Sequence, residues 1–193
     1  ILTIEDPIEY QFIDAKSIID QREIGKDAIS FEEAIKATLR QDPNIILIGE
    51  LRDLDSMRTA LTLAETGHLV LSTLHTNNAS ETVERIIDSF PTGQQSQIRS
   101  QLASVLSGVI SQRLIPSKEG KRIPAVEIMI ATTAVRNVIR EGEIHQLPGI
   151  IQTNSQIGMQ TLDASLQALI DNDAVAAEDA MPFFSTDRKI NKH

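Results

Sequence analysis

LRQDPNIILIGELRDLDSMRTALTLAETGHLVLSTLHTNNA, residues 39–79, contains two apolar runs that indicate a parallel α/β architecture. Residues 45–49 are short and almost wholly apolar, which is typical of a strand buried on both faces of a parallel sheet, and Glu50 follows directly. Residues 69–74 repeat the pattern and lead into His75. Because ligands bind outside the carboxyl ends of strands in open α/β sheets, we expect Glu50 and His75 to project from one edge.

A third strand end lies at the start of the chain. Residues 1–4 form a brief β-rich run, and the acidic residues Glu5, Asp6 and Glu9 come directly after it. If this run joins the same parallel sheet, its carboxylates reach the edge that the other two strand ends share. Carboxylates and an imidazole at one such edge predict half of a nucleotide-hydrolysing site.

Helix signals alternate with these strands. Ser30 followed by Glu33 is a capping-box start for a helix over residues 31–39, and the residues between the first strand and this helix are expected to form a loop. Asp53 or Asp55 can cap a second helix that runs through residue 63. The order strand, helix, strand, helix, strand with short links predicts an α/β fold with a mostly parallel sheet.

The pattern changes after residue 78. Amphipathic spacing predicts helices over residues 80–90 and 94–106, and the apolar runs 109–115 and 123–130 are expected to pair as a hairpin across a polar turn. Short helices are expected over residues 134–141, 143–153, 159–172 and 176–183. We place a boundary near Ile130, between a core domain over residues 1–130 and a helical C-terminal subdomain over residues 131–193.

Composition narrows the function classes. The 193 residues hold no cysteine, which excludes disulfides and thiolate metal sites. The sequence contains neither a positively charged leader nor an apolar run of about 20 residues, so we expect a cytoplasmic protein without membrane insertion. With 18 basic and 27 acidic residues the formal charge is −9, which disfavours nucleic acid as a partner. A phosphorylated small ligand is still compatible with this charge, because arginines concentrated in one half of the sequence supply positive charge locally. These arginines are Arg22, Arg40, Arg52, Arg58 and Arg85.

Several long motifs resemble those of the secretion-superfamily ATPases, which serve type II secretion and type IV pili. TIEDPIEY at residues 3–10 resembles their Asp box, LRQDPNIILIGELRD at 39–53 their Walker B motif, and TGHLVLSTLHTNNA at 66–79 their His box. AVRNVIRE at 134–141 and IQTNSQIGMQTLD at 151–163 are similar to the pilus retraction branch, the PilT-like ATPases of twitching motility.

The resemblance implies a RecA-like P-loop NTPase core from a hexameric motor that uses ATP and Mg²⁺. Such a motor works at the cytoplasmic face of the inner membrane, where it withdraws pilin subunits from the base of the fibre. The implied partners are further copies of the chain and the pilus inner-membrane platform protein.

The resemblance also implies roles for individual residues. Glu50 matches the Walker B glutamate, which orients or deprotonates the attacking water. Glu9, with Glu5 and Asp6 nearby, matches the acidic box that helps to hold metal and water; Mg²⁺ is expected near Glu9 and Glu50, without a direct ligand assignment.

The histidines and arginines complete the implied site. His75 and His68 match the two His-box positions, of which one lies close to the γ-phosphate and one supports the strand. Arg22 and Arg40 are candidates for stabilising phosphate charge, including from a neighbouring subunit.

One departure from the family limits the expected activity. The chain contains no GxxxxGK[ST] sequence, and the family places this phosphate-binding loop upstream of the Asp box. We therefore expect a fragment that hydrolyses little ATP alone and exposes a sheet edge with apolar surface, so that it associates or is partly disordered.

Two other functions stay open. A non-catalytic module for oligomerisation or pilus-base interaction needs no complete site. A metal-dependent hydrolase would use Glu50, His68 and His75 as ligands, although the chain lacks the HExxH pattern.

Overall fold

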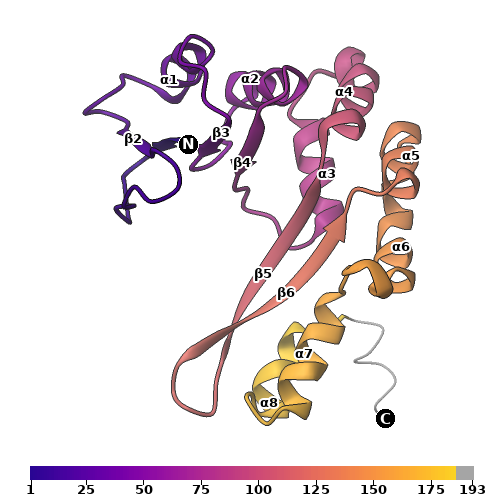
Figure 1. The fold of residues 1–193 in the computed structure, drawn as a ribbon. Helices are drawn as coiled ribbons and strands as arrows, with labels where there is room; N and C mark the ends of the chain where they lie inside the picture. The colour runs from indigo at the N-terminus through magenta and orange to yellow at the C-terminus, as the bar shows by residue number, and fades with distance from the viewer. Residues whose placement is uncertain (186–193) are drawn as a thin grey trace. The chain divides into compact units, whose positions relative to one another are not determined.

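The computed structural model describes residues 1–185 and divides into two compact units (Figure 1). The first unit contains Ile1–His75 and Ile86–Val105, and the second contains Thr76–Arg85 and the described residues from Leu106 onward. Within the described part of the chain, each helix is too short or too polar to cross a membrane.

The first unit is built on a four-stranded parallel sheet. Its strands are β1 (Leu2–Glu5), β2 (Asp20–Glu23), β3 (Ile45–Ile48) and β4 (Leu69–Ser72), in the order β2-β1-β3-β4. All three neighbouring pairs are parallel. The carboxyl ends of the strands therefore meet at one edge, and the predicted α/β fold with a parallel sheet is confirmed.

Apolar strand residues and two helices form the core of this unit. Helix α1 (Phe31–Thr38) and helix α2 (Leu54–Glu65) follow β2 and β3 in the chain and contribute Ile35 and Leu63, which are both fully buried. One cluster joins these side chains to the two central strands: Leu2, Ile4, Ala34, Ile35, Ile46, Ile48, Ala60 and Leu63. Helix α4 (Thr92–Val105) packs against α2 in the same unit.

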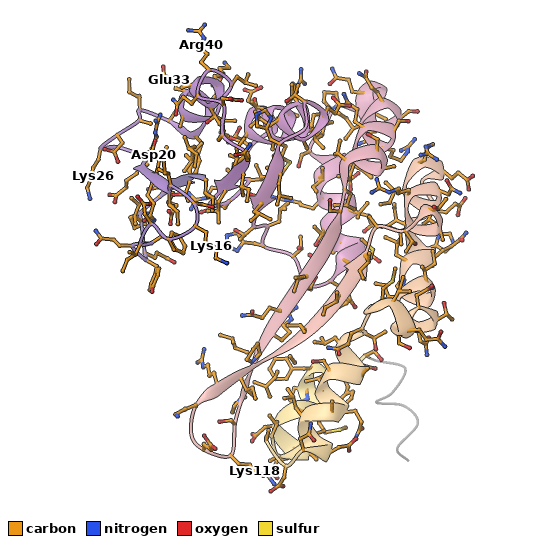
Figure 2. All side chains as sticks on the ribbon, viewed as in Figure 1. Lys16, Asp20, Lys26, Glu33, Arg40 and Lys118 are labelled. Carbon is orange, nitrogen blue, oxygen red and sulfur yellow. The ribbon has the colours of Figure 1, made fainter. Side chains whose placement is uncertain are left out.

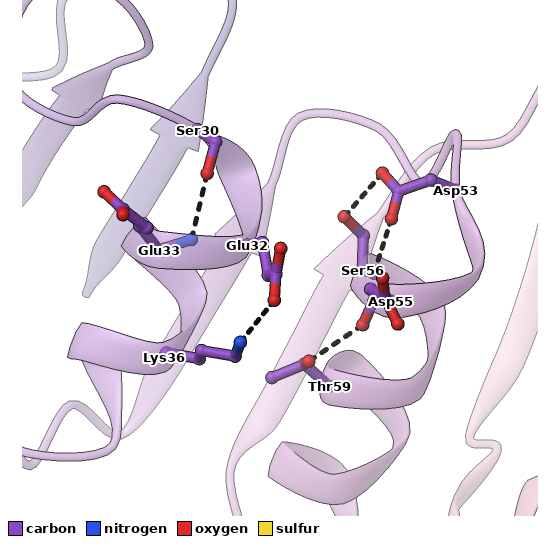
Figure 3. A network of polar contacts seen from close by, with 8 residues as sticks. All are labelled: Ser30, Glu32, Glu33, Lys36, Asp53, Asp55, Ser56 and Thr59. Atoms are coloured by element: carbon purple, nitrogen blue, oxygen red, sulfur yellow. Dashed lines mark hydrogen bonds and ion pairs between the residues drawn. The ribbon is translucent and has the colours of Figure 1, made fainter.

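Side chains cap helices α1 and α2 at their amino ends (Figure 3). The hydroxyl of Ser30 accepts a hydrogen bond of 3.2 Å from the Glu33 amide, as the capping signal predicted. The Asp53 carboxylate accepts one of 2.8 Å from the amide of Ser56, so Asp53 rather than Asp55 caps α2.

Strand β2 lies where the sequence predicted a loop, and that prediction was wrong. Its sequence, DQRE, has no apolar alternation, because β2 is an edge strand whose four side chains are all polar and at least partly exposed. The side chain of Gln21 holds the preceding loop: its amide donates to the Tyr10 carbonyl at 2.9 Å and accepts from the Phe12 amide at 2.8 Å. Such long-range pairing leaves no local sequence pattern.

The second unit contains an antiparallel ribbon and helices. Strands β5 (Gly108–Pro116) and β6 (Arg122–Ile130) pair along their full length, which confirms the predicted hairpin. Helix α3 (Ala79–Asp88) begins in this unit and ends in the first. The remaining helices are α5 (Thr133–Glu141), η1 (Ile144–Gln146), α6 (Leu147–Thr153), η2 (Ser155–Ile157), α7 (Leu162–Asp171), α8 (Ala177–Ala180) and η3 (Met181–Phe183).

The ribbon belongs with these helices. Ile115 and Ala125 of the ribbon share a buried cluster with Leu166 of α7 and Ala180 of α8. The compact units therefore do not divide near Ile130, and the expected domains 1–130 and 131–193 stay a prediction. The predicted helix over residues 159–172 begins only at Leu162, because Gln160 instead exchanges two backbone hydrogen bonds with Ile128.

Glu127 on β6 ties the ribbon to α3. Its carboxylate accepts a hydrogen bond of 2.8 Å from the backbone amide of Ala79, the first residue of α3. Burial raises the pKa of Glu127, the Ala79 hydrogen bond opposes this rise, and the negative charge of Asp163 adds to it. The charged form of Glu127 is therefore disfavoured in the folded protein.

Glu127→Gln is expected to increase the free energy of unfolding at pH 7, because the amide keeps an acceptor for Ala79 and carries no charge. Between the ordinary glutamate pKa, about 4.3, and its raised folded value, the folded wild type binds more protons than the unfolded chain. Wild-type Glu127 thus lowers the free energy of unfolding at pH values above this window. This destabilisation disappears as the pH falls below the window. Urea unfolding at several pH values checks this; a gain that stays constant down to pH 4 contradicts it.

Candidate active site

Glu50 and His75 lie together at the carboxyl edge of the sheet, as the strand pattern predicted. Glu50 is separated from the end of β3 by Gly49 alone, and its side chain is 17% exposed. One carboxylate oxygen lies 3.2 Å from His75 Nε2, and the other accepts a hydrogen bond from the guanidinium of Arg52. Both oxygens of a largely buried carboxylate are thus held in fixed directions.

The backbone around Glu50 fastens three strand ends together. The Thr73 carbonyl accepts from the Leu51 amide at 3.1 Å, and the Thr73 hydroxyl donates to the Gly49 carbonyl at 2.6 Å. The Gly49 amide donates to the Ile4 carbonyl at 2.8 Å. A Cβ atom at Gly49 would lie 3.3 Å from that carbonyl oxygen, so glycine permits this close approach of β1 to the residue before Glu50.

The electrostatics keep Glu50 ionised. The hydrogen bond from Arg52 lowers the pKa of Glu50, burial opposes this, and the His75 contact lowers the pKa further. An ionised carboxylate with fixed oxygens is a strong hydrogen-bond acceptor for water. The arrangement can therefore orient a nucleophilic water molecule at this edge.

Glu5, at the end of β1, is committed to structural contacts. Its carboxylate accepts hydrogen bonds of 2.6 Å from the Thr3 hydroxyl and 3.0 Å from the side-chain amide of Gln21. The Gln21 contact joins β1 to β2 directly before the acidic segment that follows β1. Glu5 thus supports the edge of the sheet.

Asp6 and Glu9 follow Glu5 and are both exposed. The hydrogen bond to Glu50 raises the pKa of Arg52, and the negative charge of Asp6 adds to this rise. Within residues 1–185, no three histidine, aspartate or glutamate side chains are arranged as a ready cluster for a metal ion.

His68 lies at the amino ends of the strands, whereas Glu50 lies at their carboxyl ends. It immediately precedes β4, and its Nδ1 lies 3.0 Å from the Leu63 carbonyl and 3.1 Å from the Thr66 hydroxyl, at the end of α2. The four residues of β4 span about 13 Å. The structure therefore does not bring His68 to the predicted phosphate group, and Glu50, His68 and His75 are not placed to share one metal ion.

The two candidate phosphate arginines lie apart from the Glu50 carboxylate. Arg22 is in β2 and forms an ion pair of 2.8 Å with Asp20. Arg40 follows α1, on the amino side of β3, and points outward in Figure 2. That Arg22 and Arg40 contribute to the site of a neighbouring subunit stays a prediction.

Arg52 is the residue whose place the sequence did not identify. The sequence named it only as one of five arginines, whereas the structure pairs its guanidinium with Glu50. Its position two residues after a strand-end glutamate is the signal that was available.

Comparison with known proteins gives consistent matches along the chain. Residues 1–160 match the family model described as Type II/IV secretion system protein. The chain is 49% identical over 180 residues to the type IV pilus retraction ATPase PilT of Pseudomonas aeruginosa, covering 93% of this chain and 52% of that protein. It is 49% identical over 181 residues to a twitching motility protein of Neisseria gonorrhoeae, covering 93% and 48%.

A solved structure agrees with these relatives. The crystal structure of the pilus retraction motor PilT with bound ADP superimposes with a TM-score of 0.90 at 46% identity, covering 100% of this chain and 55% of that one. The chain thus spans about half the length of the curated relatives that it matches.

Proposed function

This chain belongs to the Type II/IV secretion system protein family, and on that premise we propose that it is part of an ATP-hydrolysing motor subunit that powers type IV pilus retraction. The observation that carries the proposal is the Glu50–His75 pair at the carboxyl edge of the sheet. The names of the similar proteins, a retraction ATPase and a twitching motility protein, support the motor activity. A hexameric ring, the platform protein as partner and a location at the cytoplasmic face of the inner membrane are parts of the same proposal.

Hydrolysis of ATP needs mainly positioning and charge stabilisation from the protein. In the proposed mechanism the Glu50 carboxylate accepts a hydrogen bond from the attacking water and aligns it with the terminal phosphate. The imidazole of His75, whose side chain is 89% exposed, is free to face the same phosphate while it contacts Glu50. The hydrogen bond from Arg52 lowers the pKa of Glu50 and so favours its ionised form.

Mg²⁺ fits the acidic segment after β1. This ion commonly binds through one or two carboxylates and leaves the remaining positions to phosphates and water, so it needs no ready cluster. The exposed carboxylates of Asp6 and Glu9 would hold it near Glu50, whereas Glu5 is occupied by Thr3 and Gln21. Bound there, Mg²⁺ would neutralise charge on the phosphates.

The test of the proposal is ATP turnover by the full-length protein. We expect hydrolysis, and we expect particles of six subunits in mass photometry. An assembled protein that binds ATP without hydrolysing it would contradict the proposal and favour the non-catalytic assembly module.

Arg52→Met is expected to move the acid limb of the turnover profile to higher pH. The hydrogen bond from Arg52 is the largest cause that lowers the pKa of Glu50, so its loss lets Glu50 protonate at higher pH and stop accepting a hydrogen bond from water. The matched control is Arg122→Met, which removes an exposed arginine at the start of β6. An unchanged acid limb in Arg52→Met would contradict the role of Arg52.

A further inference from the structure

The peptide between His75 and Thr76 is one of two points where the chain passes from the first compact unit to the second. His75 belongs to the first unit, where it contacts Glu50. Residues 76–79, which we call the exit segment, belong to the second unit and lead into α3. The placement of an active-site side chain is thus coupled through one peptide bond to a different structural unit.

His75 lies midway between two anchored residues. On one side, Thr73 is bound to Gly49 and Leu51 within the first unit. On the other side, the Asn77 amide donates to the Glu81 carboxylate at 2.9 Å, and the Asn77 side-chain oxygen accepts from the guanidinium of Arg113. Four residues span at most about 14 Å, so any displacement of the Asn77 anchor is taken up at His75 and its two neighbours.

The second anchor is built on one face of the ribbon. Arg113 on β5 and Glu127 on β6 are both half-buried. Their Cα partners are Ala125 and Ser111, two positions apart along each strand, so the two side chains share a face. Arg113 donates to Asn77, and Glu127 accepts from the Ala79 amide at 2.8 Å, so the ribbon holds the exit segment at both its second and its last residue.

These contacts exceed what the start of α3 requires. The Asn78 side chain already caps the helix by accepting a hydrogen bond of 2.8 Å from the Glu81 amide. The Thr76 hydroxyl adds a contact of 2.7 Å to Thr82. Arg113 and Glu127 therefore do something other than begin the helix: they fix the exit segment to the ribbon.

We propose that Arg113 and Glu127 are positioning residues, which hold the exit segment on the ribbon and thereby set the placement of the His75 imidazole against Glu50. The proposal rests on the proposed ATPase function for its effect on turnover, but its geometric part is independent of any activity.

The first test measures turnover by the full-length protein in a double-mutant cycle. Arg113→Met is expected to lower kcat about 10- to 100-fold with little change in KM, because small misplacements of catalytic groups have effects of that size. In a His75→Ala background the same substitution is expected to cause no further loss. Equal losses in both backgrounds would overturn the proposal, because Arg113 would then act by another route.

Glu127 gives an internal rescue test. Glu127→Gln keeps an acceptor for the Ala79 amide and is expected to retain wild-type kcat. Glu127→Met removes the acceptor and is expected to lower kcat, as the single variant Arg113→Met does. Arg122→Met and Glu119→Met are matched controls, since both side chains are exposed and lie at the far end of the ribbon. Equal loss of kcat in the Gln and Met variants at position 127 would count against positioning through Ala79.

The second test needs no hydrolysis and so separates failure of this inference from failure of the proposed function. In full-length protein with ¹³C-labelled histidine, the His75 Cε1–Hε1 resonance is assigned by its loss in His75→Ala. Arg113→Met and Glu127→Met are expected to shift this resonance while the His68 resonance stays in place; Arg122→Met is expected to shift neither. A His75 resonance unmoved in both ribbon variants would overturn the proposal even if ATP turnover is confirmed.

Discussion

Glu50→Gln is expected to lower kcat for ATP hydrolysis by the full-length protein by about 10²- to 10⁴-fold, the range that general acid–base groups contribute. The amide nearly matches the carboxylate in shape, so packing at this position, where the side chain is 17% exposed, is preserved. It carries no charge, however, and it replaces one acceptor oxygen with a donor. The contact with Arg52 or that with His75 is lost, and a water molecule is no longer held by an anion.

Nucleotide binding separates a chemical effect from a folding effect. Glu50→Gln is expected to keep its affinity for ADP within a few-fold, because the effect is on the chemical step. Glu33→Gln is the matched control, since Glu33 is exposed on α1 and lies away from Glu50. Turnover that Glu50→Gln leaves unchanged would show that Glu50 does not carry the hydrolytic step.

Ile46→Ala is expected to lower the free energy of unfolding by about 2–5 kcal/mol, as large-to-small substitutions in packed cores do. Ile46 is fully buried in β3, with Leu2 and Val70 as its Cα partners in the adjacent strands. Removing three carbon atoms there leaves a cavity among groups that cannot collapse without bending the sheet. Because β3 leads to Glu50, we also expect reduced turnover near the unfolding transition.

The control for Ile46→Ala is Ile29→Ala. Ile29 has the same side chain but is 84% exposed, so its replacement is expected to change stability by no more than about 0.5 kcal/mol. Urea unfolding followed by circular dichroism gives both values. Equal and small effects would contradict the placement of Ile46 in the buried core.

The buried elements of the fold were predictable because their residues carry a local pattern. Strand β3 is a continuous apolar run, and α1 and α2 each begin with a capping side chain. Strand β2 was not predictable, because its polar residues are selected by pairing with β1 and by contacts of Gln21 with the preceding loop. Strand pairing and contacts of this kind become visible only in the folded structure.

The site was predictable to the same extent. Glu50 and His75 could be placed together because each follows a strand of one parallel sheet. His68 shows the limit of this reasoning: it precedes its strand instead of following it, which places it at the other edge. Arg113 and Glu127 had no signal at all, since they reach the exit segment from residues 36 and 48 positions further along the chain.

The unpaired side of β4 bears on how the isolated chain behaves. Within the described residues β4 pairs only with β3, and Leu69 and Leu71 on it are 45% and 46% exposed. This agrees with the exposed edge and apolar surface that the sequence predicted. Association of the isolated chain in solution stays a prediction.

The central claim is that Glu50 and His75 face the terminal phosphate of a bound nucleotide. Its most direct test is a crystal structure of the full-length protein with Mg²⁺, ADP and aluminium fluoride, which mimics the phosphoryl group in the transition state. We predict a water molecule in line with the aluminium, within hydrogen-bond distance of the Glu50 carboxylate, and the His75 imidazole facing the fluoride ligands. A nucleotide bound with its terminal group away from both Glu50 and His75 would contradict the account.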